Sequence, residues 1–269
     1  MTGPSKTLLF LGVTVVALGG GAVFGLRAGR NKIGTPGEIK PGLAVVTNAG
    51  GIGVFAARVA PGPHVILFDT GLDPQGRPVD ALLSALQAGR DDVTDVFLTH
   101  GHFDHISGVN VVPKARVHLG ASDIPMATGQ AKPAAFVPML LGLAMKTPPI
   151  TVNAPLTGTA ILPVGAPDAS GTPKVVKAIP VPGHTPGSYA YFYDGVLIAG
   201  DIMIFKDGRL ELTPWIFDPD PEANKAAIRS LKTALMGETV DIVCTSHGGC
   251  TPKGLGSNLL DDLISRIGG

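Results

Sequence analysis

Short apolar runs, rich in β-branched side chains, recur along the chain. Runs of this kind, bounded by Gly, Pro and polar residues, are typical of β-strands. Several lie before residue 100, and the others follow residue 159. The pattern predicts strands at 43–47, 54–59, 65–68, 93–99, 160–164, 175–181, 188–193, 195–199 and 241–244.

Apolar residues also recur with helical spacing. Val or Leu stands at positions 79, 82, 83 and 86, which share one face of a helix. Asp220 followed by Pro221 indicates a helix start, because Asp caps free N–H groups and Pro fits the first turn. The spacing of Leu and Ile over 259–267 predicts a last helix. Strands therefore alternate with helices, which predicts an α/β (α+β) domain.

The stretch 121–150 is less regular and unusually apolar in its second half. A helix buried in the core is the ordinary interpretation of such a run. The alternatives are an apolar cap over a binding site and a patch that touches lipid. The run 136–145, with Trp215 and Phe217, is a candidate for the wall of a binding pocket.

The first residues carry a different signal. The segment 7–26 holds twenty residues without a charge, long enough to cross a bilayer as a helix, between Lys6 and Arg27. We expect residues 1–34 to be a signal peptide or an N-terminal membrane anchor, with the uncleaved anchor favoured because no clean cleavage site follows. The expected location is the cell envelope, periplasmic or otherwise outside the cytoplasm, or anchored in the membrane. Residues 35–41 are Gly/Pro-rich and predict a linker, and residues 42–269 are expected to form the globular domain.

Composition narrows the class of protein. Hydrophobic residues make up 45% and charged residues 16%, which excludes a disordered chain. There are 21 Lys and Arg against 21 Asp and Glu, so the chain lacks the positive charge typical of nucleic-acid binders. Two cysteines rule out a disulfide-rich scaffold or a Cys-rich zinc module. Cys244 and Cys250 flank a histidine, and we expect two free thiols, with a disulfide as the alternative.

Histidines gather directly after the strand predicted at 93–99. The chain reads His-Gly-His-Phe-Asp-His there, with His100, His102, Asp104 and His105. Residues two apart on an extended strand end point to the same side, so His100 and His102 can reach one ion. The chain must then turn, which brings Asp104 and His105 from another direction. Imidazole and carboxylate ligands suit zinc, and their number suits a second ion nearby.

Three further candidates follow predicted strands. His184 comes after the strand at 175–181, Asp201 after the strand at 195–199, and His247 after the strand at 241–244. A carboxylate at the end of a buried strand is costly unless it is paired or binds a metal. Each of the three is more often structural when taken alone, but together with the first motif they predict a metal site. His64 and His118 have no such setting, and we interpret them as structural or surface residues.

These motifs resemble, in order, those of the metallo-β-lactamase-fold hydrolase superfamily. The first acidic motif of that family matches Phe68-Asp69-Thr70-Gly71, and the others match the residues above. The resemblance implies a four-layer αβ/βα sandwich with the site at one edge. It implies that His100, His102 and His184 hold one metal ion, that Asp104, His105 and His247 hold another, and that Asp201 bridges them. Asp69 would fix the histidine loop by hydrogen bonds from behind the ligands.

The resemblance also implies a reaction. Two Zn²⁺ ions per chain, with Fe or Mn as alternatives, would hold a hydroxide that attacks an ester, lactone, thioester or related bond of a small molecule. Asp104 would be the catalytic residue that orients this nucleophile. The alternatives are a mononuclear iron sulfur dioxygenase, a β-lactamase and a non-catalytic binding protein. Ile204 stands where acyl-homoserine lactonases have Tyr, and Lys206 and Arg209 match a glutathione-binding pattern poorly.

Overall fold

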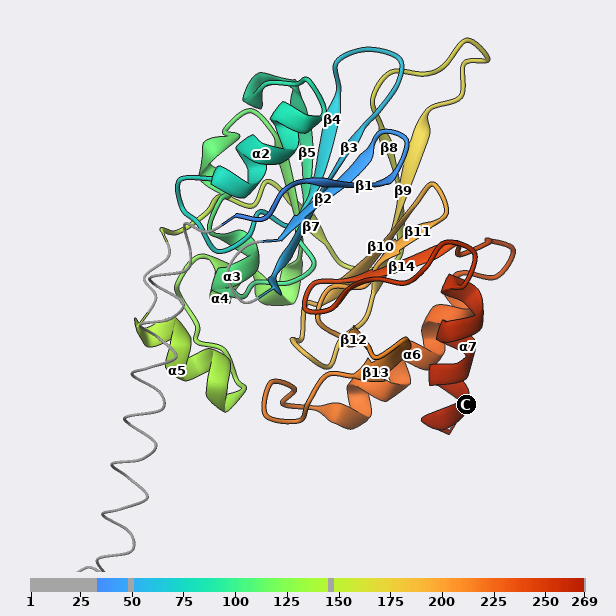
Figure 1. Cartoon of the computed structure of the whole chain (residues 1–269). Coiled ribbons are helices and arrows are strands. Elements are labelled where there is room, and N and C mark those ends of the chain that lie inside the picture. Colours follow the sequence, from blue (N-terminus) through green and yellow to red (C-terminus); the bar gives the residue numbers. More distant parts are fainter. Residues whose placement is uncertain (1–32, 48–50, 145–147, 269) are drawn as a thin grey trace, which may run out of the picture.

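The computed structural model describes residues 33–47, 51–144 and 148–268. The segment predicted to be a signal peptide or membrane anchor lies almost entirely outside these residues. Within them, no helix combines the length and the apolar character needed to cross a bilayer. The domain itself is built from two mixed sheets and the helices that cover them (Figure 1).

The first sheet has seven strands in chain order. Its first four strands pair antiparallel, and β4 to β7 pair parallel. The carboxyl ends of β4 and β5 therefore open at the same edge. The strands are β1 (Gly37–Lys40), β2 (Leu43–Thr47), β3 (Gly53–Arg58), β4 (Val65–Phe68), β5 (Val93–Phe97), β6 (Arg116–Gly120) and β7 (Ala154–Leu156).

The second sheet has the strand order β15-β14-β11-β10-β9-β8. Its pairs are antiparallel except β11 with β14, which are parallel, so their carboxyl ends also lie together. A separate hairpin pairs β12 with β13. The strands are β8 (Ala160–Val164), β9 (Lys174–Pro180), β10 (Tyr189–Tyr193), β11 (Val196–Ile198), β12 (Met203–Lys206), β13 (Arg209–Leu212), β14 (Ile242–Thr245) and β15 (Gly249–Cys250).

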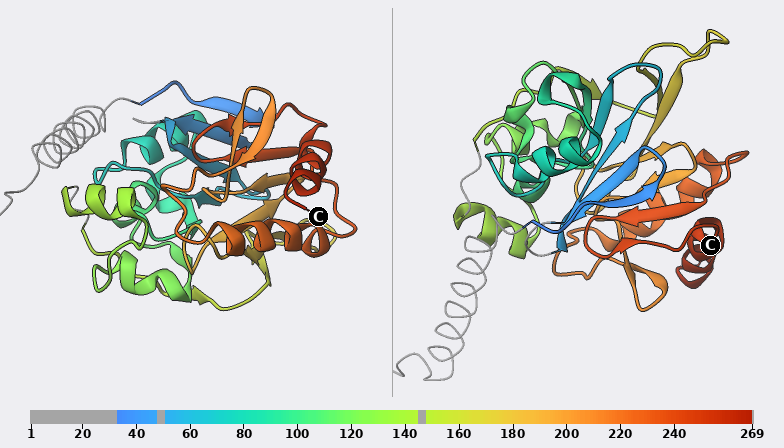
Figure 2. Two further views of the ribbon diagram at one scale, coloured as in Figure 1. Left: turned by 90° about the horizontal axis from the view of Figure 1, so that it is seen from below. Right: turned by 45° about the horizontal axis from the view of Figure 1, so that its top comes forward.

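Helices cover the outer faces of both sheets (Figure 2). Helix α2 packs on β2 and β3, whereas α6 and α7 pack on the second sheet. The start predicted for α6 is confirmed, because the Asp220 side chain accepts a hydrogen bond from Ala223 N at 2.9 Å and Pro221 is the first helical residue. The helices are α2 (Arg77–Ala85), α3 (Phe103–Ile106), α4 (Ile124–Ala127), α5 (Phe136–Ala144), α6 (Pro221–Ala234) and α7 (Gly256–Arg266).

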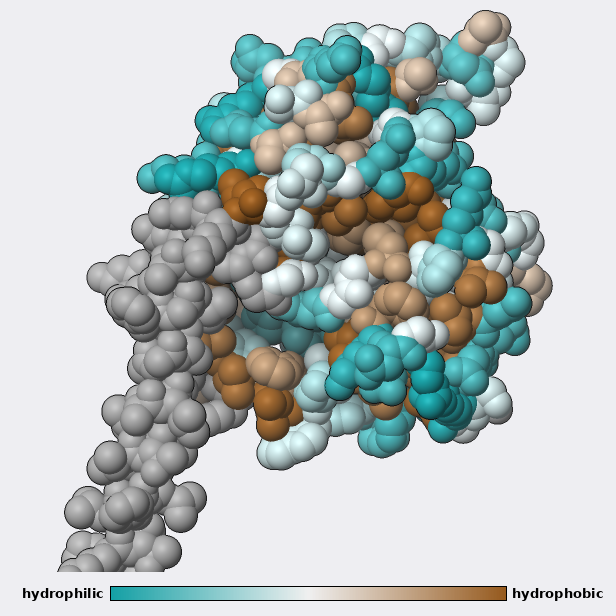
Figure 3. Space-filling view, in the orientation of Figure 1, coloured by the Kyte–Doolittle hydropathy of each residue, from teal (hydrophilic) through white to brown (hydrophobic). Residues whose placement is uncertain are grey.

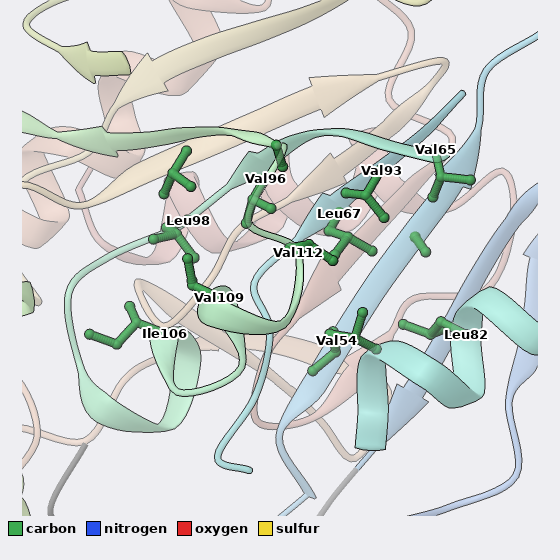
Figure 4. Close-up of a cluster of buried hydrophobic side chains, with 14 of the residues drawn as sticks. Val54, Val65, Leu67, Leu82, Val93, Val96, Leu98, Ile106, Val109 and Val112 are labelled. Atoms are coloured by element: carbon green, nitrogen blue, oxygen red, sulfur yellow. The ribbon is translucent and has the colours of Figure 1, made fainter. Parts of the chain in front are cut away.

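Alternation along the strands divides the core into layers. In β3, Val54 faces the cluster beneath α2 (Figure 4), whereas Phe55 faces the other sheet. Between the sheets, Phe68 and Phe97 stack with ring centroids 5.5 Å apart, and Tyr191 packs on both. A third cluster lies between the second sheet and α6 and α7. The mixed sheets with helices outside agree with the predicted fold class.

Two sequence expectations are wrong. The predicted linker at 35–41 contains β1, which pairs with β2 at the edge of the first sheet, where Gly- and Pro-rich sequence is tolerated. Its Ile39 packs against the cluster between the sheets, so the sheet begins before Gly42. Cys244 and Cys250 form a disulfide in place of two free thiols, because β14 and β15 place them opposite one another.

Candidate metal centre

All the predicted ligands lie beyond the carboxyl ends of strands, at one edge of the two sheets. His100 and His102 follow β5, and the short helix α3 carries Asp104 and His105. The second sheet supplies the others, from the segments after β9, β11 and β14: His184, Asp201 and His247. The structure therefore brings together every residue that the motifs predicted, from positions up to 147 residues apart in sequence (100 and 247).

His100, His102 and His184 form what we call the three-histidine group. Nδ1 of His102 lies 2.9 Å from Nε2 of His100 and 3.1 Å from Nε2 of His184. All three rings are buried. Three imidazole nitrogens thus converge on one point, which is the arrangement of a histidine metal site.

Hydrogen bonds behind the ligands set the ring orientation of His100. The Thr99 hydroxyl donates to Asp69 Oδ2 at 2.8 Å, so it is left to accept from His100 Nδ1 at 3.0 Å. With its proton on Nδ1, the His100 ring turns the lone pair of Nε2 toward the other two histidines. Neutral rings that turn lone pairs toward one another repel unless a cation lies between them.

Asp104, His105 and His247, together with Asp201, form what we call the mixed group. Asp104 Oδ2 lies 3.7 Å from His247 Nε2 and 3.9 Å from His105 Nε2. Asp201 Oδ2 lies 3.3 Å from His247 Nε2 and 3.5 Å from His105 Nε2. The same oxygen is 3.6 Å from Nε2 of His184 in the three-histidine group. Asp201 therefore faces both groups.

Asp69 supports the mixed group from behind, as the resemblance implied. Its Oδ2 accepts a hydrogen bond from His105 Nδ1 at 2.8 Å, which turns His105 Nε2 toward the ligands. Its Oδ1 accepts from Thr99 N at 2.8 Å. Asp69 is fully buried and has a φ of 57°, a left-handed conformation that a non-Gly residue adopts at some cost. The turn after β4 is thus strained in order to place this carboxylate.

The charge states of the two groups differ. Burial lowers the pKa of His100 well below its usual value and brings those of His102 and His184 to about 4. Nearby histidines lower the pKa of His100 further. The three-histidine group is therefore neutral near pH 7, which is the state in which imidazole binds a metal ion.

The mixed group is charged. Asp201 raises the pKa of His247 to about 10. Burial lowers the pKa of His105, but Asp201 and Asp69 outweigh it and raise that pKa well above its usual value. For the carboxyl group of Asp104 burial acts in the opposite direction and raises the pKa. His105 and His247 more than offset this effect and lower the pKa of Asp104 to about 2. Two imidazolium ions and two carboxylates therefore face one another when no ion is bound.

The donor atoms fit a metal ion. Five buried side-chain atoms of the described residues have no hydrogen-bond partner, and two of them, His105 Nε2 and Asp201 Oδ1, face each other's side chains in the mixed group. Buried polar atoms are almost always satisfied, so these two indicate a missing ligand. The donors are imidazole nitrogens and carboxylate oxygens, a set that suits zinc, iron and manganese. Helix α3 and the ends of β11 and β14 point these atoms inward.

Sequence reasoning missed Asp123, which links the two loops of the three-histidine group. Its Oδ2 accepts hydrogen bonds from Gly101 N at 2.8 Å and Thr185 Oγ1 at 2.6 Å, and its Oδ1 accepts from Gly187 N at 2.8 Å. A Cβ on Gly187 would lie 2.6 Å from Asp123 N, so only glycine allows this approach. In the sequence, the only sign of this role is a single Asp in the segment that follows β6.

A cavity of about 340 Å³ opens above the ligands. Its walls confirm two candidates for the pocket, since Phe217 and the α5 residues Pro138 and Leu141 line it. Trp215 does not line it and is 78% exposed. The lining residues are Ile52, His102, Phe103, Asp104, Pro138, Leu141, His184, Asp201, Ile204, Thr213, Pro214, Phe217 and His247.

The two histidines without a predicted role lie outside the centre. His118 bonds to Asp95 Oδ1 at 2.8 Å and stacks on Phe97, with ring centroids 4.5 Å apart. It is a structural residue of the first sheet. His64 lies just before β4, at the opposite end of that strand from Asp69, and its carbonyl accepts a hydrogen bond from Val59 N.

Comparisons with known proteins agree with the motifs. The chain is similar to the probable metallo-hydrolase YflN of Bacillus subtilis, with 28% identity over 236 residues, 80% of this chain and 87% of that protein. It is 32% identical to hydroxyacylglutathione hydrolase of Fuscovulum blasticum over 180 residues, 65% of this chain and 54% of that protein. Its fold resembles a beta-lactamase from Chitinophaga pinensis, with a TM-score of 0.60, 17% identity, and 87% and 91% of the two chains covered.

Residues 49–247 match the model of one protein family. That span is most of the chain, and it includes Asp69 and both ligand groups. The chain belongs to the metallo-beta-lactamase superfamily.

Proposed function

We propose that the protein is a dinuclear metal-dependent hydrolase, with Zn²⁺ as the ion, acting on an ester, lactone or thioester of a small molecule. The observation that carries the proposal is the position of Asp201 Oδ2, within 3.3–3.6 Å of nitrogens from both groups. A carboxylate shared in this way is what a pair of ions requires. His100, His102 and His184 would hold one ion, and Asp104, His105 and His247 the other.

The reaction adds one water across the acyl bond, which breaks to give a carboxylic acid and an alcohol or thiol. Divalent ions, when bound, supply Lewis acidity and lower the pKa of water. Asp104 lines the cavity and has its pKa held at about 2, so it is an ionised acceptor at neutral pH. We assign to it the orientation of the attacking water. The cavity of about 340 Å³ has the size of sites that bind small molecules.

Metal analysis separates this proposal from a mononuclear iron oxygenase on the same fold. The protein is purified without added metal or chelator, and the ions per chain are measured by plasma emission spectroscopy. Two zinc ions per chain, with hydrolysis of acyl substrates that chelator abolishes and zinc restores, support the proposal. One iron per chain with oxygen consumption would overturn it and favour the oxygenase.

We also propose that the domain works outside the cytoplasm, in the cell envelope. The Cys244–Cys250 disulfide supports this, because such bonds persist in oxidising compartments. The apolar segment 7–26 supports it as well. Cell fractionation and alkylation of intact cells test the location. Free thiols in a cytoplasmic fraction would contradict it.

A further inference from the structure

The cavity above the ligands has walls without charge. Outside the ligand residues and Thr213, it is lined by aliphatic and aromatic side chains from segments of both sheets. Phe103 and the α5 residues Pro138 and Leu141 come from segments between strands of the first sheet, and Ile204 of β12 and Phe217 come from the segment between β11 and β14 of the second. None of the described lining residues is Lys or Arg.

Outside the ligand candidates, the described lining residues also offer no free side-chain hydrogen-bond donor. Thr213 is the only polar one that is not a ligand candidate, and its hydroxyl already donates to the backbone carbonyl of Asp201. Ile204 offers no polar atom. The cationic residues Lys206 and Arg209 lie opposite one another on β12 and β13, at the exposed tip of the hairpin. Neither lines the cavity.

The apolar surface continues to the rim. Trp215 and Ile216 lie between the lining residues Pro214 and Phe217, and they are 78% and 37% exposed. Figure 3 shows apolar side chains low on the molecule, where Figure 1 places α5 and the loop before α6. A substrate that extends from the ligands toward solvent would therefore meet apolar surface along its length.

We propose that the site selects an uncharged substrate whose group remote from the scissile bond is apolar, such as an alkyl ester or an alkyl-substituted lactone. This inference rests on the proposed function. A remote carboxylate would lose its water against walls that offer it no partner, which is costly. Glutathione thioesters and β-lactams carry such carboxylates, so both should be poor substrates.

Binding of hydroxamic acids to the zinc-loaded protein tests this without turnover, because the hydroxamate head chelates metal ions. Isothermal titration compares acetohydroxamic acid, hexanohydroxamic acid and the monohydroxamate of adipic acid, which has a six-carbon chain ending in a carboxylate. We expect the Kd to fall by about fourfold per methylene from the first to the second. The adipic compound should bind at least about tenfold more weakly than the hexano compound.

A matched pair of variants locates the effect. Ile204→Lys places a cation in the cavity wall and should shift the preference toward the adipic compound by about tenfold or more. Ile161→Lys makes the same change on β8, at a position 56% exposed and outside the cavity, and should leave the preference unchanged.

The outcomes separate the two proposals. Equal Kd values for the short and long chains, or tighter binding of the adipic compound by the unaltered protein, would overturn the substrate class and leave the hydrolase intact. If none of the three compounds binds, the metal centre itself is wrong and the substrate class falls with it.

Discussion

The three-histidine group and the mixed group share Asp201 and one sheet edge, but they differ in charge and support. The first consists of buried rings whose pKa values burial lowers, so it is neutral near pH 7. The second pairs carboxylates with imidazolium ions, and its His247 side chain is 33% exposed. The first group is ready for an ion, whereas the second must release protons to take one.

This difference shows that two ligand sets of similar chemistry can differ in their affinity for a metal ion. Near pH 7 the three-histidine group should bind its ion first and more tightly. At the same pH, the mixed group should bind its ion more weakly than the three-histidine group does. Its affinity should increase as pH rises, because the ion competes with the protons of His105 and His247. The predictions below test this contrast.

Removing one ligand from each group should have the largest effect. We expect His102→Ala to lose metal and to lower activity by more than the 10- to 100-fold typical of residues behind the ligands. His247→Ala should keep one ion per chain, because the three-histidine group is intact. Metal analysis and kcat/KM check both. Normal turnover by a folded, metal-depleted His102→Ala variant would contradict the role of the group.

Stability of the chelator-treated protein should fall on both sides of about pH 6.5. His102 and His184 have folded pKa values of about 4, so the unfolded chain binds more protons between pH 6.5 and 4 and stability is lost as pH falls. The effect is at most about 3 kcal/mol for each. His247 has a folded pKa of about 10, so stability is lost as pH rises from 6.5 to 10.

Tm measured in chelator from pH 4 to 10 checks this. His184→Ala should flatten the acid limb, and His247→Ala the alkaline limb. An alkaline limb that persists unchanged in His247→Ala would show that another group is responsible.

Asp123 should act on the three-histidine group. We expect Asp123→Asn to weaken binding of the first ion by about 10- to 100-fold, because the amide nitrogen that replaces one carboxylate oxygen cannot accept a hydrogen bond, so either Gly187 N or both Gly101 N and Thr185 Oγ1 lose their acceptor. Competition with a chelator of known zinc affinity measures this. Asp95→Asn is the control, since Asp95 is also buried but bonds to His118 and Arg116. If both variants lowered zinc affinity equally, the role of Asp123 would be structural only.

Removing the disulfide should weaken metal binding by the mixed group, with the smallest effect of the changes considered. Cys244 and Cys250 close a short loop that holds His247. Closing a loop of this length is worth about 2 kcal/mol in the unfolded chain. Cys250→Ser should therefore lower Tm modestly and weaken the second ion by less than about tenfold, with the first ion unchanged. Zinc titration of oxidised and reduced protein checks this, and equal loss of both ions would contradict it.

Much of the centre could be predicted because its ligands follow strands with a local signal. The motif at 100–105 stands after an apolar run, and strand ends of like direction meet at one edge. Asp69 could be placed only through the family resemblance. Asp123 could not, because one Asp in an ordinary loop carries no pattern and its partners Gly101 and Gly187 are distant in sequence.

The fold shows the same limit. Apolar runs rich in β-branched residues located β2, β3 and β4, where one face meets each core cluster. The same pattern did not locate β6 inside the first sheet, nor β1 and β7, which lie at sheet edges and contain or adjoin Pro, nor the β12–β13 hairpin. Edge strands are defined by pairing with a neighbour, and that pairing leaves little trace in the residues themselves.

The division of ligands between the two sheets has a consequence for biosynthesis. Residues 100–105 leave the ribosome well before His184, Asp201 and His247, which follow strands of the second sheet. The full set of donors therefore exists only once the second sheet has been made and has packed on the first. Metal acquisition is in this sense the closing step of maturation, and the ion is drawn from whichever compartment holds the finished fold.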